Sequence, residues 1–91
     1  MSSASNRYKV ELSDVAKKDL AGLDGQIQRR VRLAFSVLGK NPRPPLAKKL
    51  KGQKGYRVRV GNYRIIYKIF DEKILVLVVR IGHRRDIYKY D

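Results

Sequence analysis

Apolar and polar residues alternate along residues 8–12 and 56–60 of the chain. A period of two places successive side chains on opposite faces of a pleated strand, so both stretches are predicted to be strands with one buried face. Residues 63–70 are read as a return strand, because Gly61-Asn62 has the form of a two-residue hairpin turn with glycine first. Residues 74–81 are almost continuously apolar, which is typical of an interior strand covered on both faces.

Between the first two of these strands, apolar residues recur at helical spacing, which predicts two helices on residues 14–38. One stripe follows an N-cap signal at Ser13-Asp14, and the other ends at Gly39 and a proline-rich segment; the stripes are Ala16, Leu20 and Leu23, then Ile27, Val31 and Leu38. We expect residues 1–91 to form a single α+β domain. Its N-terminal strand is followed by a two-helix antiparallel hairpin and a mostly antiparallel sheet of three or more strands. The helices would pack on one face, leaving a basic concave face opposite.

Composition narrows the kind of partner and site. The chain carries 22 Lys and Arg against 8 Asp and Glu, a net charge of +14, which indicates a polyanionic partner: nucleic acid, an anionic membrane surface or an acidic protein. With no cysteine and one histidine, we expect no disulfide, no metal site and no cofactor. The polar residues 1–6 contain no secretion signal and no apolar run is long enough to cross a membrane, so a cytoplasmic protein is expected.

Arginines are the candidates for the basic face. Arg57 and Arg59 project the same way from one predicted strand, and Arg64 shares their face if the hairpin pairs Val60 with Tyr63. The remaining cationic candidates are Arg84 and Arg85 after the last strand, and Lys51 and Lys54 in a basic loop. Converging guanidiniums offer paired donors to phosphate oxygens, which predicts a phosphate-binding surface. The alternative is an ordinary solvated strand face.

Some of the tyrosines are predicted to be core residues, whereas one tyrosine and the histidine are candidates for the functional site. Tyr56, Tyr63 and Tyr67 have the spacing of core residues, whereas Tyr88 lies in a polar tail and is available to stack on a base. His83 is of the residue type that titrates nearest neutrality, which makes it a candidate for proton transfer. The alternative for a lone histidine is a structural role.

Two motifs resemble the RelE toxin family, part of the RelE/ParE superfamily of type II toxin–antitoxin modules. They are Gly-Asn-Tyr-Arg at residues 61–64 and Gly-His-Arg-Arg-Asp-Ile-Tyr at residues 82–88, and the resemblance covers nearly the whole chain. It implies a metal-independent endoribonuclease that enters the ribosomal A site and cuts mRNA there, inhibiting translation. The attacking group would be the ribose 2′-hydroxyl. The resemblance also implies an acidic, RelB-like cognate antitoxin that neutralises the toxin in a hetero-oligomer.

Roles follow from the matching positions. Arg64 and Arg84 match family arginines that would stabilise the phosphate in the transition state, and Tyr88 matches a tyrosine that would stack on a base or help proton transfer. Arg57 and Arg59 stand where some members have lysines, one of them a proposed general base. Because a guanidinium holds its proton tightly, we expect His83 or Tyr88 to supply the proton transfer instead.

Two other functions are open at this point. A ParE-like toxin of the same fold would act on DNA gyrase without cutting RNA, and a basic RNA-binding domain would be non-catalytic. Overexpression separates them in part, because either toxin should arrest growth and an inert binder should be tolerated.

Overall fold

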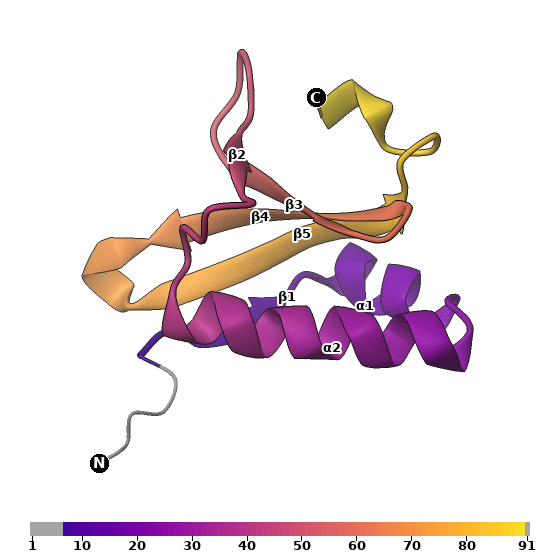
Figure 1. Cartoon of the computed structure of the whole chain (residues 1–91). Helices are drawn as coiled ribbons and strands as arrows, with labels where there is room; N and C mark the ends of the chain where they lie inside the picture. The colour runs from indigo at the N-terminus through magenta and orange to yellow at the C-terminus, as the bar shows by residue number, and fades with distance from the viewer. Residues whose placement is uncertain (1–6, 91) are drawn as a thin grey trace.

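The computed structural model describes residues 7–90, so the polar leader of residues 1–6 and the terminal residue 91 lie outside the described part (Figure 1). Its elements follow the predicted order of strand, two helices and further strands. They are β1 (Lys9–Leu12), α1 (Asp14–Ala21), α2 (Gly25–Lys40), β2 (Lys48–Lys49), β3 (Tyr56–Val60), β4 (Tyr63–Phe70), a short 3-10 helix (Asp71–Lys73), β5 (Leu75–His83) and a second 3-10 helix (Tyr88–Tyr90).

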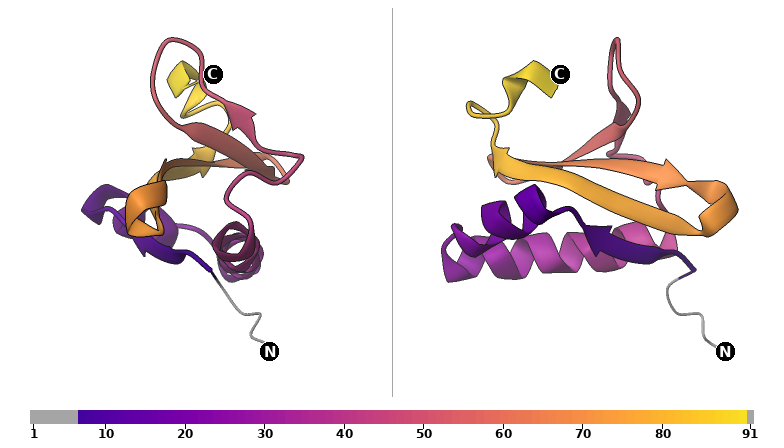
Figure 2. Two further views of the ribbon diagram at one scale, coloured as in Figure 1. Left: turned by 90° about the vertical axis from the view of Figure 1, so that its left-hand side faces the viewer. Right: turned by 180° about the vertical axis from the view of Figure 1, so that it is seen from behind.

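The five strands form one sheet in the order β1-β5-β4-β3-β2. β1 runs parallel to β5, and the other described neighbours are antiparallel. Both helices cover one face, whereas the loop after β2 and the C-terminal tail rise from the other, as Figure 2 shows from two further directions. The predicted α+β class and the helices on one face are confirmed.

The helices begin where capping side chains satisfy their free backbone N–H groups. The Ser13 hydroxyl accepts a hydrogen bond from the Ala16 amide at 3.0 Å, and the Asp24 carboxylate accepts one from the Ile27 amide at 3.1 Å. The buried helix residues pack with the inner face of the sheet into the main core, which includes Ala16, Leu20, Val31, Leu38, Val58, Ile65, Tyr67, Val76 and Val78. Apolar side chains removed from water in this way supply the main stabilisation of the fold.

A second, smaller core lies on the opposite face of the sheet. Leu50, Ile66 and Ile87 are buried there, with Val79 and Tyr90 packed against them. β5 is therefore covered on both faces, as its continuous apolar run predicts. Ile87 is fully buried, so the C-terminal tail is anchored on the sheet and is more than a polar extension.

The predicted start and end of the last strand were wrong by one or two residues. Ile74 closes the preceding 3-10 helix in a left-handed conformation with φ of 51°, and its amide donates to the Asp71 carbonyl at 3.1 Å. Its side chain is 52% exposed, so it does not belong to the buried strand. At the other end β5 continues through His83, which pairs with Tyr63 of β4.

An ion pair ties α1 to the middle of β5. The Asp19 carboxylate accepts hydrogen bonds from the Arg80 side chain at 2.9 and 3.4 Å and from the Ile81 amide at 2.9 Å. The register shifts at this place, because Ile66 pairs with Arg80 and Tyr67 pairs with Val78. This shift in register is a β-bulge in β5. The bulge and the contact with α1 together orient the last residues of β5, which lead into the candidate site.

Candidate RNA-binding and catalytic site

The β3–β4 hairpin places two arginines directly opposite each other. Val60 pairs with Tyr63 as expected, which makes Arg59 and Arg64 the next cross-strand pair on the face away from the helices. The pair that closes a two-residue hairpin is hydrogen-bonded, so the next pair is of the non-hydrogen-bonded kind, whose side chains lie closer together. Arg64 is buried, with 7% of its surface exposed, whereas Arg59 is exposed.

Arg84 joins these two arginines at the end of the sheet. Its amide donates a hydrogen bond to the carbonyl of Asn62 in the hairpin turn at 2.9 Å. Gly61 permits this turn, because its φ of 62° is a conformation that other residues adopt only with strain. A cavity of about 90 Å³ results, lined by Arg59, Gly61, Asn62, Tyr63, Arg64 and Arg84. We call it the arginine cavity.

The arginine cavity is suited to an anion. Three arginines line it, and no residue with a carboxylate is among the lining residues. Fixed cations of this kind stabilise negative charge that develops on a phosphate, and they do so without reorganising during the reaction. Arg64 is held by its burial, so it supplies the most rigid of the three donors.

His83 lies on the helix-facing side of the sheet and does not line the arginine cavity. Its ring meets Tyr63 edge-to-face with centroids 5.4 Å apart, and its Nδ1 accepts a hydrogen bond from the Arg85 amide at 3.2 Å. This contact assigns the proton of the neutral ring to Nε2. His83 instead lines a cavity of about 360 Å³ together with Asp19 and Arg80.

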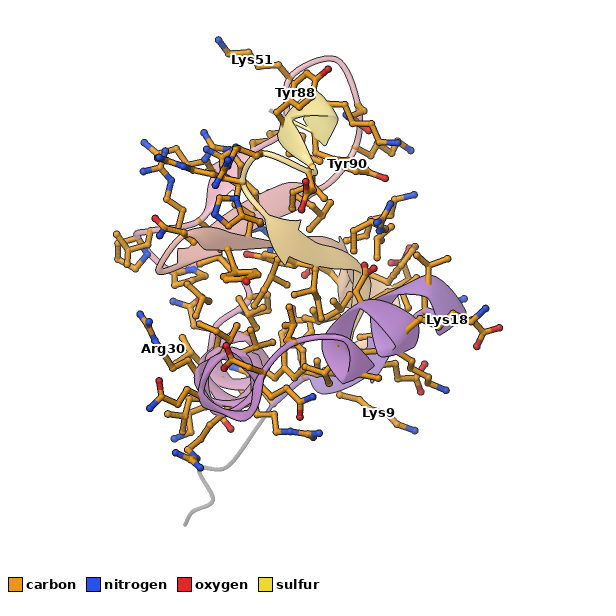
Figure 3. The ribbon with its side chains drawn as sticks, turned by 90° about the vertical axis from the view of Figure 1, so that its right-hand side faces the viewer. Lys9, Lys18, Arg30, Lys51, Tyr88 and Tyr90 are labelled. Atoms are coloured by element: carbon orange, nitrogen blue, oxygen red, sulfur yellow. The ribbon has the colours of Figure 1, made fainter. Side chains whose placement is uncertain are left out.

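Tyr88 is 71% exposed on the C-terminal 3-10 helix. Figure 3 places Tyr88 and Lys51 on the side of the sheet away from the helices, with Arg30, Lys9 and Lys18 on the other side. The tail therefore brings Tyr88 to the same face as the arginines. Arg85 is exposed in this tail, and its contact with His83 is made through the backbone.

The remaining predicted RNA-binding residues divide between two further cavities. Arg57 and Arg59 line one of about 310 Å³ with Leu46 and Lys48. Lys54 belongs to another, of about 420 Å³, whose cationic lining residues are Arg43, Lys49, Lys54 and Lys68. The basic residues thus extend from the arginine cavity along β3 and β2.

The tyrosines predicted to be core residues differ in burial. Tyr67 is fully buried, and its hydroxyl donates to the Pro42 carbonyl at 2.7 Å; burial raises the pKa of this hydroxyl. Tyr56 is half-buried and stacks on Tyr67, with ring centroids 5.8 Å apart. Tyr63 is half-buried at the end of the sheet, where it lines the arginine cavity.

Sequence reasoning missed Arg30 of α2. A Cβ atom placed on Gly61 would lie 3.0 Å from Nη1 of Arg30, so this guanidinium supports the hairpin turn from the helix side. In the sequence Arg30 appears only as a charged residue off the apolar stripe, and nothing there links it to a turn 31 positions later.

Neither a metal site nor a membrane span is found in the described part. Within residues 7–90, no group of three His, Cys, Asp or Glu side chains is arranged to hold a metal ion. Over the same residues, no helix combines the length and the apolar character needed to cross a bilayer.

Comparison with known proteins identifies the family. A family model described as the ParE toxin of the type II toxin–antitoxin system parDE matches residues 10–88. Toxin RelG of Mycobacterium tuberculosis is 36% identical over 86 residues, covering 90% of this chain and 97% of RelG. The chain belongs to the RelE family of toxins. The family model carries the name ParE and this relative a Rel name, which agrees with the resemblance to the RelE/ParE superfamily.

Two further similarities extend the comparison of this RelE-family toxin. The crystal structure of the RelBE2 toxin–antitoxin complex from M. tuberculosis contains a chain with a TM-score of 0.77 and 32% identity, and the match covers 87% of this chain and 93% of that one. The mRNA interferase toxin RelE of Escherichia coli K12 is 26% identical over 80 residues, covering 85% of this chain and 83% of that protein. The fold and the family are thereby established together.

Proposed function

We propose that this RelE-family toxin is a ribosome-dependent, metal-independent endoribonuclease that cuts mRNA in the A site. The observation that carries the proposal is the arginine cavity, where Arg59, Arg64 and Arg84 converge at the end of the hairpin. The relative named mRNA interferase supports RNA as the substrate. A toxin that acts on ribosomes works in the cytoplasm, and we propose that location.

The chemistry is a transesterification within the RNA. The 2′-hydroxyl of a ribose loses its proton as its oxygen attacks the adjacent phosphorus. The bond from phosphorus to the 5′-oxygen breaks, and the 5′-oxygen takes up a proton, so that a 2′,3′-cyclic phosphate and a 5′-hydroxyl are formed. The phosphate gains negative charge in the transition state, and Arg64 and Arg84 stabilise it, with Arg59 beside them. Further basic residues, which include Arg57, Arg85, Lys51 and Lys54, hold the RNA backbone.

Proton transfer is assigned to Tyr88. It is exposed on the same side of the sheet as the arginines, whereas His83 faces the helix side. The Nδ1 contact of His83 with the Arg85 amide gives the histidine a positioning part in the tail. Tyr88→Phe should therefore reduce the rate of cleavage, and His83→Gln should reduce it less. Full cleavage by Tyr88→Phe would remove the assignment.

The charge of the chain supports an acidic antitoxin as its partner. A surface with a net charge of +14 attracts acidic segments, and binding folds such segments when they are disordered alone. The similar chain in the RelBE2 complex is bound to an antitoxin, which supports a RelB-like partner in a hetero-oligomer.

The proposal is tested by mRNA cleavage on programmed ribosomes with an empty A site. Wild type should cut in the A-site codon, and Arg64→Ala and Arg84→Ala should each lower the rate by about 100-fold or more, as expected for loss of one transition-state donor. Arg29→Ala, an exposed arginine of α2, is the matched control and should cut at the wild-type rate. Toxicity without cleavage would point to gyrase or another target, and neither activity would leave a basic binding domain.

A further inference from the structure

An apolar groove opens between α2 and the outer edge of β3. It has a volume of about 290 Å³, and its lining residues are Ala34, Val37, Leu38, Pro44, Pro45, Leu46, Val58 and Arg59. Two of these side chains are unusually exposed for their type, Val37 at 51% and Leu46 at 74%. In a chain with a net charge of +14, exposed apolar surface of this kind marks an interaction site.

The sheet edge beside this groove is open. β2 pairs with Arg57 through Lys48, and continuing that register would place Leu46 opposite Arg59. The chain turns away instead, because the Ala47 amide donates to the Pro44 carbonyl at 2.9 Å. Among the described strands, none pairs with residues 58–60 on this side.

The open edge presents hydrogen-bonding groups of Arg59. Arg59 and Arg64 form a non-hydrogen-bonded pair, so the backbone N–H and C=O of Arg59 point away from β4 and toward the groove side. An added strand can pair with such an edge and place alternate side chains in the neighbouring pocket. The groove floor of Ala34 and Leu38 is suited to one apolar side chain of that strand.

The charge of the surface around the groove indicates which kind of partner binds there. Arg59 also lines the adjoining cavity with Arg57 and Lys48, so the groove continues directly into a basic surface. A second copy of this chain would be repelled, because it also carries a net charge of +14. Prolines and lysines near the strand edge also disfavour its pairing with the same edge of another copy. An acidic chain meets both the apolar groove and its basic border.

We propose that an extended segment of the acidic antitoxin pairs with β3 at Arg59 and inserts an apolar side chain into the groove between α2 and Leu46. Its acidic side chains lie against Arg57, Arg59 and Lys48. The same segment thereby covers one of the three arginines of the arginine cavity, which links docking directly to inhibition. This assignment rests on the proposed function, because it names the place where that partner binds.

Lysine substitutions separate apolar docking from charge attraction. Val37→Lys and Leu46→Lys fill the groove with a cation, whereas Leu33→Lys and Val15→Lys add the same charge at exposed apolar positions outside it, 64% and 50% exposed. The antitoxin encoded beside the toxin gene is co-expressed, and the dissociation constant of its complex is measured with each variant. Cleavage on ribosomes is the control for folding and should remain at the wild-type rate in Val37→Lys, Leu33→Lys and Val15→Lys. Leu46 also lines the cavity of Arg57 and Arg59, so the folding of Leu46→Lys is checked by thermal unfolding instead.

We expect the groove variants to bind the antitoxin at least 10-fold more weakly, with both controls within about 2-fold of wild type or tighter, because added positive charge alone favours an acidic partner. In the wild-type complex the Arg59 amide should become protected from hydrogen exchange. Wild-type affinity in both groove variants, or an Arg59 amide that stays unprotected, would overturn the assignment alone. Absence of any complex with the wild-type chain would overturn it together with the proposed partner.

Discussion

Ile87 is the most deeply buried residue of the C-terminal tail. It is fully buried and belongs to one core cluster with Leu50, which is 6% exposed, and Ile66, which is 2% exposed. Gly82 allows the close approach, since a Cβ there would lie 3.1 Å from Cγ2 of Ile87. The amides of Asp86 and Ile87 donate locally, to the His83 carbonyl at 2.8 and 3.3 Å. Ile87 is therefore the most buried of the tail side chains that pack on the sheet, with Tyr90 packed beside it.

Ile87→Ala removes three carbon atoms from this small core. At about 0.8 kcal/mol for each buried methylene-sized group, the transfer contribution is about 2.4 kcal/mol. A rigid cavity would raise the loss toward about 5 kcal/mol, but the tail and the loop that carries Leu50 are free to collapse, so the lower end applies, about 2 kcal/mol. For a domain of this size, that corresponds to a fall in Tm of roughly 8–16 °C.

Thermal unfolding and residue-resolved hydrogen exchange measure the two consequences. Tm should fall by the amount above, and amides of residues 84–90 should exchange faster while those of β4 stay protected. Cleavage should fall as well, because Tyr88 follows the tail. Leu33→Ala, at a position 64% exposed, is the control and should change the free energy of unfolding by less than about 0.5 kcal/mol. An unchanged Tm with unchanged tail protection in Ile87→Ala would refute the reasoning.

Three further predictions concern stability. Tyr67→Phe leaves the Pro42 carbonyl without its buried donor and should lower the free energy of unfolding by about 1–3 kcal/mol in a denaturant titration, whereas Tyr88→Phe should leave it unchanged. Ile74→Asn should raise the free energy of unfolding by about 1 kcal/mol, since asparagine tolerates the left-handed conformation better than a β-branched residue; a lower Tm would contradict this. The Arg43 guanidinium and then the Tyr8 hydroxyl bind the Asp71 carboxylate and hold its pKa below the usual range. That contribution is present above pH about 4 and is lost as pH falls through the lowered value, so Tm should drop on acidification less steeply in Asp71→Asn than in wild type.

The sequence predicted the hairpin and its arginines well because both depend on local rules. The Gly61-Asn62 turn sets the pairing of Val60 with Tyr63, and alternation then places Arg59 opposite Arg64. Arg84 follows because it comes directly after β5, beside the turn. The arginine cavity was thus predictable in outline from strand periodicity and one turn.

Other features depend on contacts between distant residues and have no local signal. Ile87 is a single apolar residue in a polar tail, with no periodicity to mark it as buried. The ion pair of Asp19 with Arg80 joins residues 61 positions apart, and the shift in register beside it cannot be read from an apolar run. The position of His83 also has no local signal, because only the extension of β5 to that residue places its ring beside Tyr63.

The central claim is that the arginine cavity promotes attack by a ribose 2′-hydroxyl. The most direct measurement compares two mRNAs on A-site-empty ribosomes, identical except for one 2′-deoxynucleotide at the position that is cut. The wild-type toxin should cut the all-ribose messenger to a 2′,3′-cyclic phosphate and leave the deoxy messenger intact, and Arg64→Ala should cut the all-ribose messenger at least about 100-fold more slowly. Equal cleavage of both messengers, or full cleavage by Arg64→Ala, would contradict the account.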